Sequence, residues 1–287
     1  MSALITAVDL AAELASEDPP AVLDASLVLH SPDFDGDYRK DNGRPHWLEA
    51  HIPGSQHVDV ATEFSDPASP WHYAHPSPDA IAARLAALGI AEGRRVVIYD
   101  TTATMWAARL WYLLTWIGVD ARVLDGGLGV WRAAGLPVEG GESAPPAPVP
   151  AWGAAPRRDA WIERDEVAAR SADDARPLVC ALPASLFDGS APTRYSRRGR
   201  IPGSVNVSSR NLFAEDGTFV GSDALRAAFA SAGIDGTEPE VQLYCGGGIS
   251  ASVDALALHE LGIRAVRIYD GSLEEWSADP DLPLEVG

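Results

Sequence analysis

The stretch that decides the fold is VQLYCGGGIS, which spans residues 241–250. Its first four residues form a short apolar run typical of a buried strand, and the segment after the glycines is predicted to be a helix that ends near Leu261. Three consecutive glycines, Gly246, Gly247 and Gly248, permit backbone conformations that other residues avoid, so successive N–H groups can turn inward where the helix begins. Such a loop is suited to binding an anion.

Cys245 occupies the first position of this loop. A sulfur atom placed there lies in the field of the inward amides, and we expect that field to favour the thiolate, which is the nucleophilic form of cysteine. The alternative is a small residue packed inertly at the end of a strand. The succession of strand, glycine loop and helix favours the nucleophile.

The chain repeats its motifs in the same order. IPGS occurs at 52–55 and 201–204, YD at 99–100 is matched by YC at 244–245, DGG at 125–127 is matched by DGS at 270–272, and tryptophan follows at Trp131 and Trp276. The spacing between the copies is nearly constant, which indicates a duplication. Asp100 therefore stands in the first half where the second half has Cys245.

A length of 287 residues is enough for two cores. Residues 140–156 contain five prolines, which suits an extended linker and no helix. We therefore predict a first domain at residues 1–140, a proline-rich linker at 141–157 and a second domain at 158–287.

Each half alternates short apolar runs with helical stretches. This pattern predicts the α/β class, in which each domain has a mainly parallel sheet with helices on both faces. The expected strands lie at 22–29, 96–99, 122–124, 178–182, 241–244 and 266–269. Ser77 is expected to cap a helix that has Pro78 at its first position and ends at Gly89, and residues 222–233 repeat that design.

Composition excludes several classes of partner. The net charge of −19 disfavours nucleic acid and anionic lipid, and the longest apolar run, residues 110–119, is shorter than the ~20 residues of a bilayer span. The first 20 residues are acidic rather than basic, unlike a secretory signal, so we expect a soluble, cytoplasmic protein. Two cysteines form no disulfide framework, and no paired His or Cys spacing supports a metal site, although seven histidines leave one formally open. Cys180 is expected to pack within its strand.

Taken together, the paired IPGS segments, the DGG and DGS turns followed by tryptophan, and the six-residue loop that opens with cysteine resemble the rhodanese family. They are most similar to its two-domain thiosulfate and 3-mercaptopyruvate sulfurtransferases, over nearly the whole chain. The resemblance implies two tandem rhodanese-like domains. It also implies that Cys245 is the sulfur-carrying residue and that Asp100 marks the domain that has lost this cysteine.

The reaction implied by the resemblance is a ping-pong sulfur transfer that needs no cofactor and no metal. The Cys245 thiolate attacks the outer sulfur of thiosulfate or the thiol sulfur of 3-mercaptopyruvate and becomes a persulfide. Cyanide, a small thiol or a thioredoxin-like protein then removes the sulfur. The N–H groups of Gly246, Gly247, Gly248, Ile249 and Ser250 would stabilise the negative charge. The Ser250 hydroxyl has two candidate roles, a hydrogen bond to sulfur and a cap on the following helix.

The resemblance leaves the donor open. The loop lacks the basic residues of the thiosulfate type, and Gly246 is typical of the mercaptopyruvate type, yet Gly247 stands where that type has serine or threonine. The arginine that holds the donor's anionic group in the family is replaced by Leu186. Residues 193–200 hold four arginines, Arg194, Arg197, Arg198 and Arg200, of which we expect Arg194, and next Arg198, to bind the donor; the alternative is a solvated basic loop.

Other first-domain residues match the family less closely. Ala61 stands at the position of the family's acidic residue, with Asp59 two residues earlier, and His72 and His75 are candidates for the cleft or for an exposed loop. The tryptophans at 106, 111, 116 and 131 are expected in the core or between the domains. The donor pocket itself is expected between the two domains.

Two other functions fit part of the pattern. Dual-specificity phosphatases also place a cysteine at an anion-binding loop, but that loop is one residue longer and ends in arginine, whereas Ser250 and Ala251 stand here. The stronger alternative is a non-catalytic rhodanese-fold binding or sulfur-relay module, because Leu186, Gly247 and Ala61 depart from the catalytic pattern.

Overall fold

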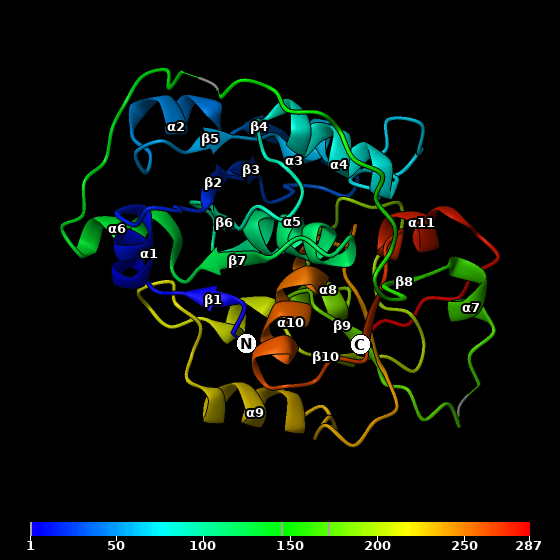
Figure 1. The fold of residues 1–287 in the computed structure, drawn as a ribbon. Coiled ribbons are helices and arrows are strands. Elements are labelled where there is room, and N and C mark those ends of the chain that lie inside the picture. Colours follow the sequence, from blue (N-terminus) through cyan, green and yellow to red (C-terminus); the bar gives the residue numbers. More distant parts are fainter. Residues whose placement is uncertain (1, 145, 172) are drawn as a thin grey trace.

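The computed structural model describes residues 2–144, 146–171 and 173–287, so Pro145 of the predicted linker lies outside the described residues. Each half of the chain forms a five-stranded sheet in which every paired strand runs parallel to its neighbour (Figure 1). This arrangement agrees with the predicted α/β class.

The first sheet has the strand order β1-β7-β6-β2-β5. Its strands are β1 (Leu4–Ile5), β2 (Ala21–Asp24), β5 (Gln56–His57), β6 (Val96–Tyr99) and β7 (Ala121–Leu124). A short antiparallel pair joins β3 (Leu27–Leu29) to β4 (Lys40–Asn42). The helices of this half are α1 (Ala7–Leu14), α2 (Arg44–Glu49), α3 (Val60–Glu63), α4 (Pro78–Ala87), α5 (Met105–Trp116) and α6 (Gly127–Ala133).

The second sheet has the order β10-β9-β11-β12-β8. Its strands are β8 (Trp161–Ile162), β9 (Leu178–Cys180), β10 (Val205–Asn206), β11 (Val241–Tyr244) and β12 (Val266–Tyr269). The helices are α7 (Arg164–Ala168), α8 (Ala184–Phe187), α9 (Ser222–Ala230), α10 (Ile249–Glu260) and α11 (Ser272–Ala278), with a short 3₁₀ helix, η1 (Ser209–Leu212).

The local signals explain most of these elements. Ser77 accepts a hydrogen bond from the Ala80 N–H with Pro78 at the first turn of α4, so the predicted cap is confirmed. The expected strand at 22–29 is wrong in one respect, because it breaks into β2 and β3 where the Asp24 side chain accepts the Ser26 N–H at 2.8 Å. Helix α9 begins after Gly221 without a side-chain cap, so it does not repeat the design of α4.

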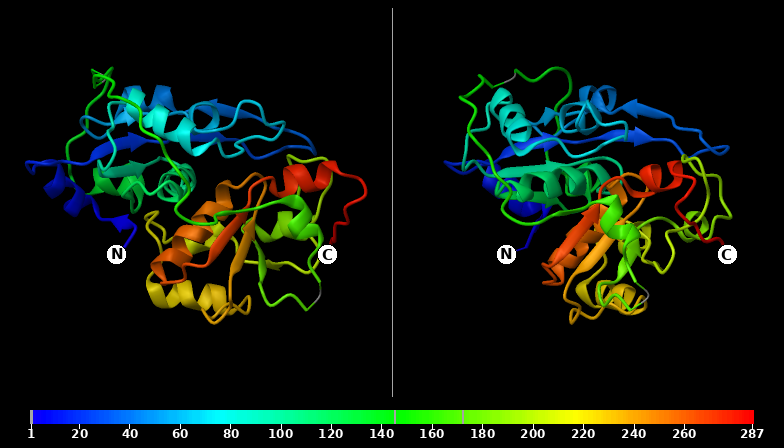
Figure 2. Two further views of the ribbon diagram at one scale, coloured as in Figure 1. Left: turned by 45° about the vertical axis from the view of Figure 1, so that its right-hand side comes forward. Right: turned by 90° about the vertical axis from the view of Figure 1, so that its right-hand side faces the viewer.

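The two halves lie against each other, with α5 of the first half packed on α10 of the second (Figure 2). One apolar core runs through both halves, and Trp106, Trp111 and Trp116 of α5 are buried in it. Trp131 lies instead in a separate core of the first half. The prediction that these tryptophans serve packing is confirmed.

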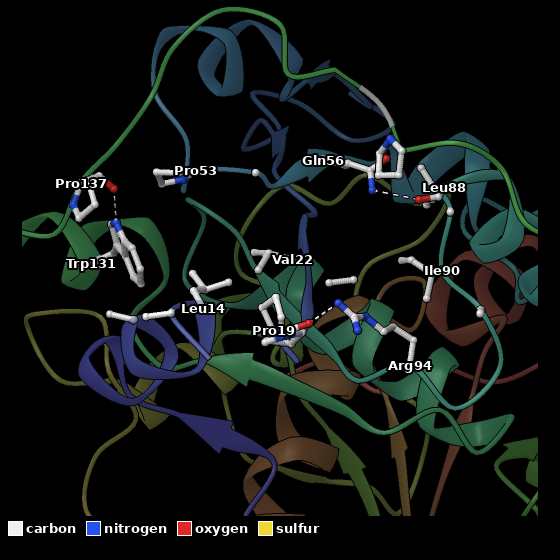
Figure 3. Close-up of a pocket in the computed structure, with 18 residues that line it drawn as sticks. Leu14, Pro19, Val22, Pro53, Gln56, Leu88, Ile90, Arg94, Trp131 and Pro137 are labelled. Atoms are coloured by element: carbon white, nitrogen blue, oxygen red, sulfur yellow. Dashed lines mark hydrogen bonds between the residues drawn. The ribbon is translucent and has the colours of Figure 1, made fainter. Parts of the chain in front are cut away.

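A cavity of about 790 Å³ lies in the first half and is bordered by Leu14, Val22 and Trp131 (Figure 3). Pro146 of the extended segment after α6 contributes to its wall, and further along this segment the Val149 N–H donates to the Ala86 carbonyl. None of the described residues around this cavity belongs to the loop at residues 245–250. Within the described residues, no helix combines the length and apolar character that a membrane span requires.

Candidate active site

The glycine loop, residues 245–250, follows β11 at the carboxyl end of its strand and leads directly into α10. Gly248 adopts a positive φ of 76° just before the helix begins. A Cβ on Gly248 would lie 2.6 Å from Asp270 Oδ1 and 2.8 Å from Arg109 Nη1. Glycine is therefore required there by both backbone conformation and space.

Ser272, in the DGS turn after β12, fastens this loop. Its hydroxyl accepts the N–H groups of Cys245 at 3.1 Å and Gly248 at 3.3 Å, and donates to the Tyr269 carbonyl at 2.7 Å. The carbonyls of Cys245 and Gly246 in turn accept hydrogen bonds from N–H groups at the start of α11. The second copy of the repeated turn thus holds the loop in shape.

The corresponding loop of the first half is filled by its own side chain. The Asp100 carboxylate accepts four backbone N–H groups at 2.9 to 3.0 Å, those of Thr102, Thr104, Trp106 and Ala107. Burial raises the pKa of Asp100, and these four donors oppose that rise by stabilising the anion. The Asp100 loop therefore shows how this backbone surrounds a buried acidic group.

In the second half, the four backbone N–H groups at the corresponding positions have no acceptor among the described residues. By the repeat, the counterparts of these donors are Gly247, Ile249, Ala251 and Ser252, and no acceptor for their N–H groups lies among the described residues. Cys245 is 1% exposed and stands where Asp100 stands in the first half. The loop around Cys245 thus repeats the backbone of the Asp100 loop without the carboxylate that fills it.

Cys245 borders a cavity of about 70 Å³ that both halves enclose. The first half contributes Leu29, Tyr38, Tyr73 and Met105, and the second contributes Leu182, Pro183, Leu186, Arg194, Tyr195, Ser209, Arg210 and the glycine-loop residues Cys245, Gly246, Gly247, Ile249 and Ser250. The pocket therefore lies between the halves, as expected.

The arginine-rich loop divides into members with different surroundings. Arg194 lies in the cavity wall, where one terminal nitrogen donates to the His30 carbonyl and the buried Nε has no partner in the described residues. Arg198, the second candidate, is not in the wall and binds both carboxylate oxygens of Asp35 at 2.8 and 2.9 Å. Arg197 donates to backbone carbonyls in the last turn of α11 and just after it, including those of Ser277 and Asp279.

The chain matches known proteins over most of its length. The Rhodanese-like domain family matches residues 7–134 and 164–279. The chain belongs to the rhodanese family. The 3-mercaptopyruvate sulfurtransferase of Escherichia coli is 33% identical over 83% of this chain and 84% of its own, and thiosulfate/3-mercaptopyruvate sulfurtransferase 2 of Arabidopsis thaliana is 33% identical over 92% and 81%. The crystal structure of SseA from Escherichia coli superimposes with a TM-score of 0.81 at 28% identity, covering 95% of this chain and 99% of that one.

These matches confirm the predicted fold of two rhodanese-like domains and the prediction of a sulfurtransferase. This rhodanese therefore acts on a small-molecule sulfur donor. Cys180, its other cysteine, is fully buried in β9, and burial raises the pKa of its thiol to about 12. The expectation that Cys180 packs within its strand is confirmed.

Three tyrosines and one arginine of the pocket were not anticipated from the sequence. Tyr38, Tyr73 and Tyr195 bring phenol rings to the cavity, and Arg210 of η1 brings an exposed guanidinium that has no partner among the described residues. Burial raises the pKa of Tyr73 to about 12. No local pattern marks these residues, because they come from separate segments that only the tertiary fold brings together.

Other expected site residues lie elsewhere. Ser250 borders the cavity, but Gly248 is the N-cap residue of α10 and no described side chain caps that helix. Of the two candidate roles of Ser250, the helix cap is therefore wrong, and the hydrogen bond to sulfur stays a prediction. Asp59 caps α3, and His75 stacks on Trp161.

The His72 side chain forms a hydrogen bond of 2.5 Å with Glu274 of the second half. It lies beside Gly247 but outside the cavity wall. In the described part of the chain, no cluster of three or more His, Cys, Asp or Glu residues is arranged to hold a metal ion.

Proposed function

We propose that this rhodanese carries sulfur as a persulfide on Cys245, taken from thiosulfate or 3-mercaptopyruvate. The observation that supports the proposal is the pair of matched loops. In the first half four backbone amides bind the Asp100 carboxylate. Their four counterparts around Cys245 have no acceptor among the described residues. A sulfur added to Cys245 would give a side chain about as long as aspartate, with a negative charge at its end.

The first half-reaction loads the cysteine. With thiosulfate, the Cys245 thiolate attacks the outer sulfur, the donor's S–S bond breaks, and its electron pair leaves with sulfite. With 3-mercaptopyruvate the C–S bond breaks, and the carbon that receives the electron pair takes up the proton of the donor's thiol, which yields pyruvate. Both routes leave the same persulfide anion on Cys245, where the loop amides stabilise it.

In the second half-reaction an acceptor attacks the outer sulfur and the Cys245 thiolate leaves. Cyanide would become thiocyanate, and a small thiol or a thioredoxin-like protein would become a persulfide. We propose that this reaction takes place in the cytoplasm, which the two free cysteines and the acidic composition support. We also propose that residues 141–157 link the two domains.

Arg194 and Arg210 are proposed to hold the anionic end of the donor. Both border the Cys245 cavity, and each has donor groups without a partner in the described residues. A guanidinium suits the carboxylate of mercaptopyruvate and the sulfonate-like end of thiosulfate equally well. Arg194→Ala and Arg210→Ala are expected to raise KM for both donors about tenfold, as for the loss of one charge-assisted hydrogen bond, whereas Arg198→Ala leaves KM close to that of the unaltered protein.

The persulfide is tested by intact-mass measurement after incubation with each donor in turn. The protein should gain one sulfur atom, Cys180→Ser should gain it equally, and Cys245→Ser should gain none. Addition of cyanide should remove the extra mass and release thiocyanate. If neither donor adds sulfur, the persulfide proposal fails and the non-catalytic binding or relay module replaces it. Turnover of p-nitrophenyl phosphate is expected to be absent, and its presence would point to the phosphatase alternative.

A further inference from the structure

The tip of the Tyr195 side chain lies directly against the glycine loop. A Cβ built on Gly246, the neighbour of Cys245, would lie 1.4 Å from the Tyr195 hydroxyl oxygen and 2.4 Å from Cζ. The phenol therefore takes the space in which any residue other than glycine would place its side chain. This close approach gives Gly246 a reason to be glycine that is independent of backbone conformation, since its φ is not positive.

The segment that carries Tyr195 is held from both sides. Arg194, before it, donates to the His30 carbonyl of the first half. Arg197, after it, donates to the Ser277 carbonyl at 2.9 Å in the second half. The ring is thus fixed where the halves meet, and it lies in the wall of the cavity that contains Cys245.

The Tyr195 hydroxyl has no hydrogen-bond partner among the described residues. No donor or acceptor pairs with it, whereas the hydroxyls of Tyr99 and Tyr244 bond Ser55 and Ser204 at 2.9 and 2.8 Å. The Tyr195 side chain is only partly buried and borders the cavity that contains the reactive cysteine, so its hydroxyl can donate to a group that arrives with the reaction.

We propose that Tyr195 is a catalytic residue whose hydroxyl donates a hydrogen bond to the sulfur carried by Cys245. This inference rests on the proposed persulfide, and it identifies a hydroxyl donor in a loop whose third position, Gly247, has none. No proton is transferred in this role. The atoms and electrons of the sulfur transfer balance as before, and the hydrogen bond strengthens as negative charge gathers on the outer sulfur.

The protonation state of the phenol suits this role. Burial raises the pKa of Tyr195 above that of an ordinary tyrosine, and the adjacent charge of Cys245 raises it further. The hydroxyl therefore keeps its proton, and remains a donor, across the whole range in which a cysteine thiolate forms.

The test is Tyr195→Phe, which keeps the ring and removes the hydroxyl. We expect kcat/KM for sulfur transfer to fall about tenfold with either donor, as for the loss of a hydrogen bond to a charged group. In the sulfur-loaded protein, the pH profile for alkylation of the persulfide on Cys245 should also shift to higher pH, by about one unit, because a tenfold change in an equilibrium corresponds to one pH unit. A residue that only packs against the loop would not move that pH profile.

Tyr99→Phe is the matched control, because it removes a buried phenol hydroxyl from the first half, away from the cavity. It should keep the kinetics and the pH profile of the unaltered protein. A second variant, Gly246→Ala, should displace the Tyr195 ring and reproduce the loss caused by Tyr195→Phe. If both Tyr195→Phe and Gly246→Ala keep normal kinetics and an unshifted profile, the inference is overturned. Intact mass of the unaltered protein separates the two failures. No gain of sulfur overturns the persulfide proposal, whereas a gain of sulfur with unchanged kinetics and profile in the two variants overturns the Tyr195 inference alone.

Discussion

Replacing Asp254 by asparagine is expected to stabilise the protein at neutral pH and to remove part of its pH dependence. Asp254 lies in α10, its side chain is fully buried, and neither carboxylate oxygen has a hydrogen-bond partner among the described residues. Burial alone raises the pKa of Asp254 well above its usual value. An unpaired carboxyl group of this kind is neutral in the folded protein over a pH range in which it is ionised in the unfolded chain.

The size of the effect follows from proton linkage. Above about pH 4 the unfolded chain has released the Asp254 proton while the folded protein still holds it, so the free energy of unfolding falls as pH rises towards the folded pKa. One proton corresponds to about 1.4 kcal/mol per pH unit. Asparagine has nearly the same shape and no proton to release. The stability difference between Asp254→Asn and the unaltered protein should therefore grow by about 1.4 kcal/mol for each pH unit in this window.

Urea denaturation at pH 4.5, 5.5 and 6.5 measures this difference directly, and Asp281→Asn serves as the control because Asp281 is an exposed aspartate. The control should follow the unaltered protein at every pH. Contributions from all other titrating groups are shared by the variants and cancel in the difference. If Asp254→Asn and the unaltered protein give parallel plots of unfolding free energy against pH, the carboxyl group is ionised in the folded state and the reasoning is wrong.

Three further predictions concern other buried groups. Asp100→Ala should lower the free energy of unfolding by at least about 2 kcal/mol in urea denaturation, because it leaves four backbone N–H groups without an acceptor, while sulfur loading of Cys245 continues. Arg109→Met should lower the free energy of unfolding by about 3–5 kcal/mol in the same assay, because Asp270 loses the buried counter-charge that it contacts at 2.8 Å. Adding Asp270→Asn should recover part of that loss. Cys180 should remain unmodified by iodoacetamide at pH 8 in the native protein, as peptide mapping would show, because its raised pKa leaves little thiolate.

The central strands were predictable because they are buried on both faces. Residues 96–99, 241–244 and 266–269 are strands with the predicted bounds, each a short apolar run next to turn residues. The edge strands β1, β5, β8 and β10 have two residues each, too few for any periodic pattern. Their position depends on pairing with a neighbour, which is not encoded locally.

The site was predictable only where the chain itself brings residues together. Cys245 and its glycines are contiguous, so the pattern of strand, loop and helix indicated them. Arg194 and Arg198 are four residues apart in one loop, and the sequence could not separate them. Only the fold places Asp35 opposite Arg198 and leaves the Nε of Arg194 without a partner. Tyr195 was overlooked for the same reason, since its relation to Gly246 is purely spatial.

The two halves share the backbone of one loop, and each half places a different group inside it. In the first half the anionic group is part of the chain, so the Asp100 loop is complete as soon as it folds, and Met105, which follows this loop at the start of α5, borders the Cys245 cavity. In the second half we propose that the reaction supplies the anion, so that the amides around Cys245, which have no acceptor among the described residues, are paired once sulfur is bound. On this proposal the amides favour the persulfide anion over the bare thiol, and so they lower the cost of taking sulfur from a donor. The same stabilisation must stay modest, since an acceptor has to remove the sulfur again.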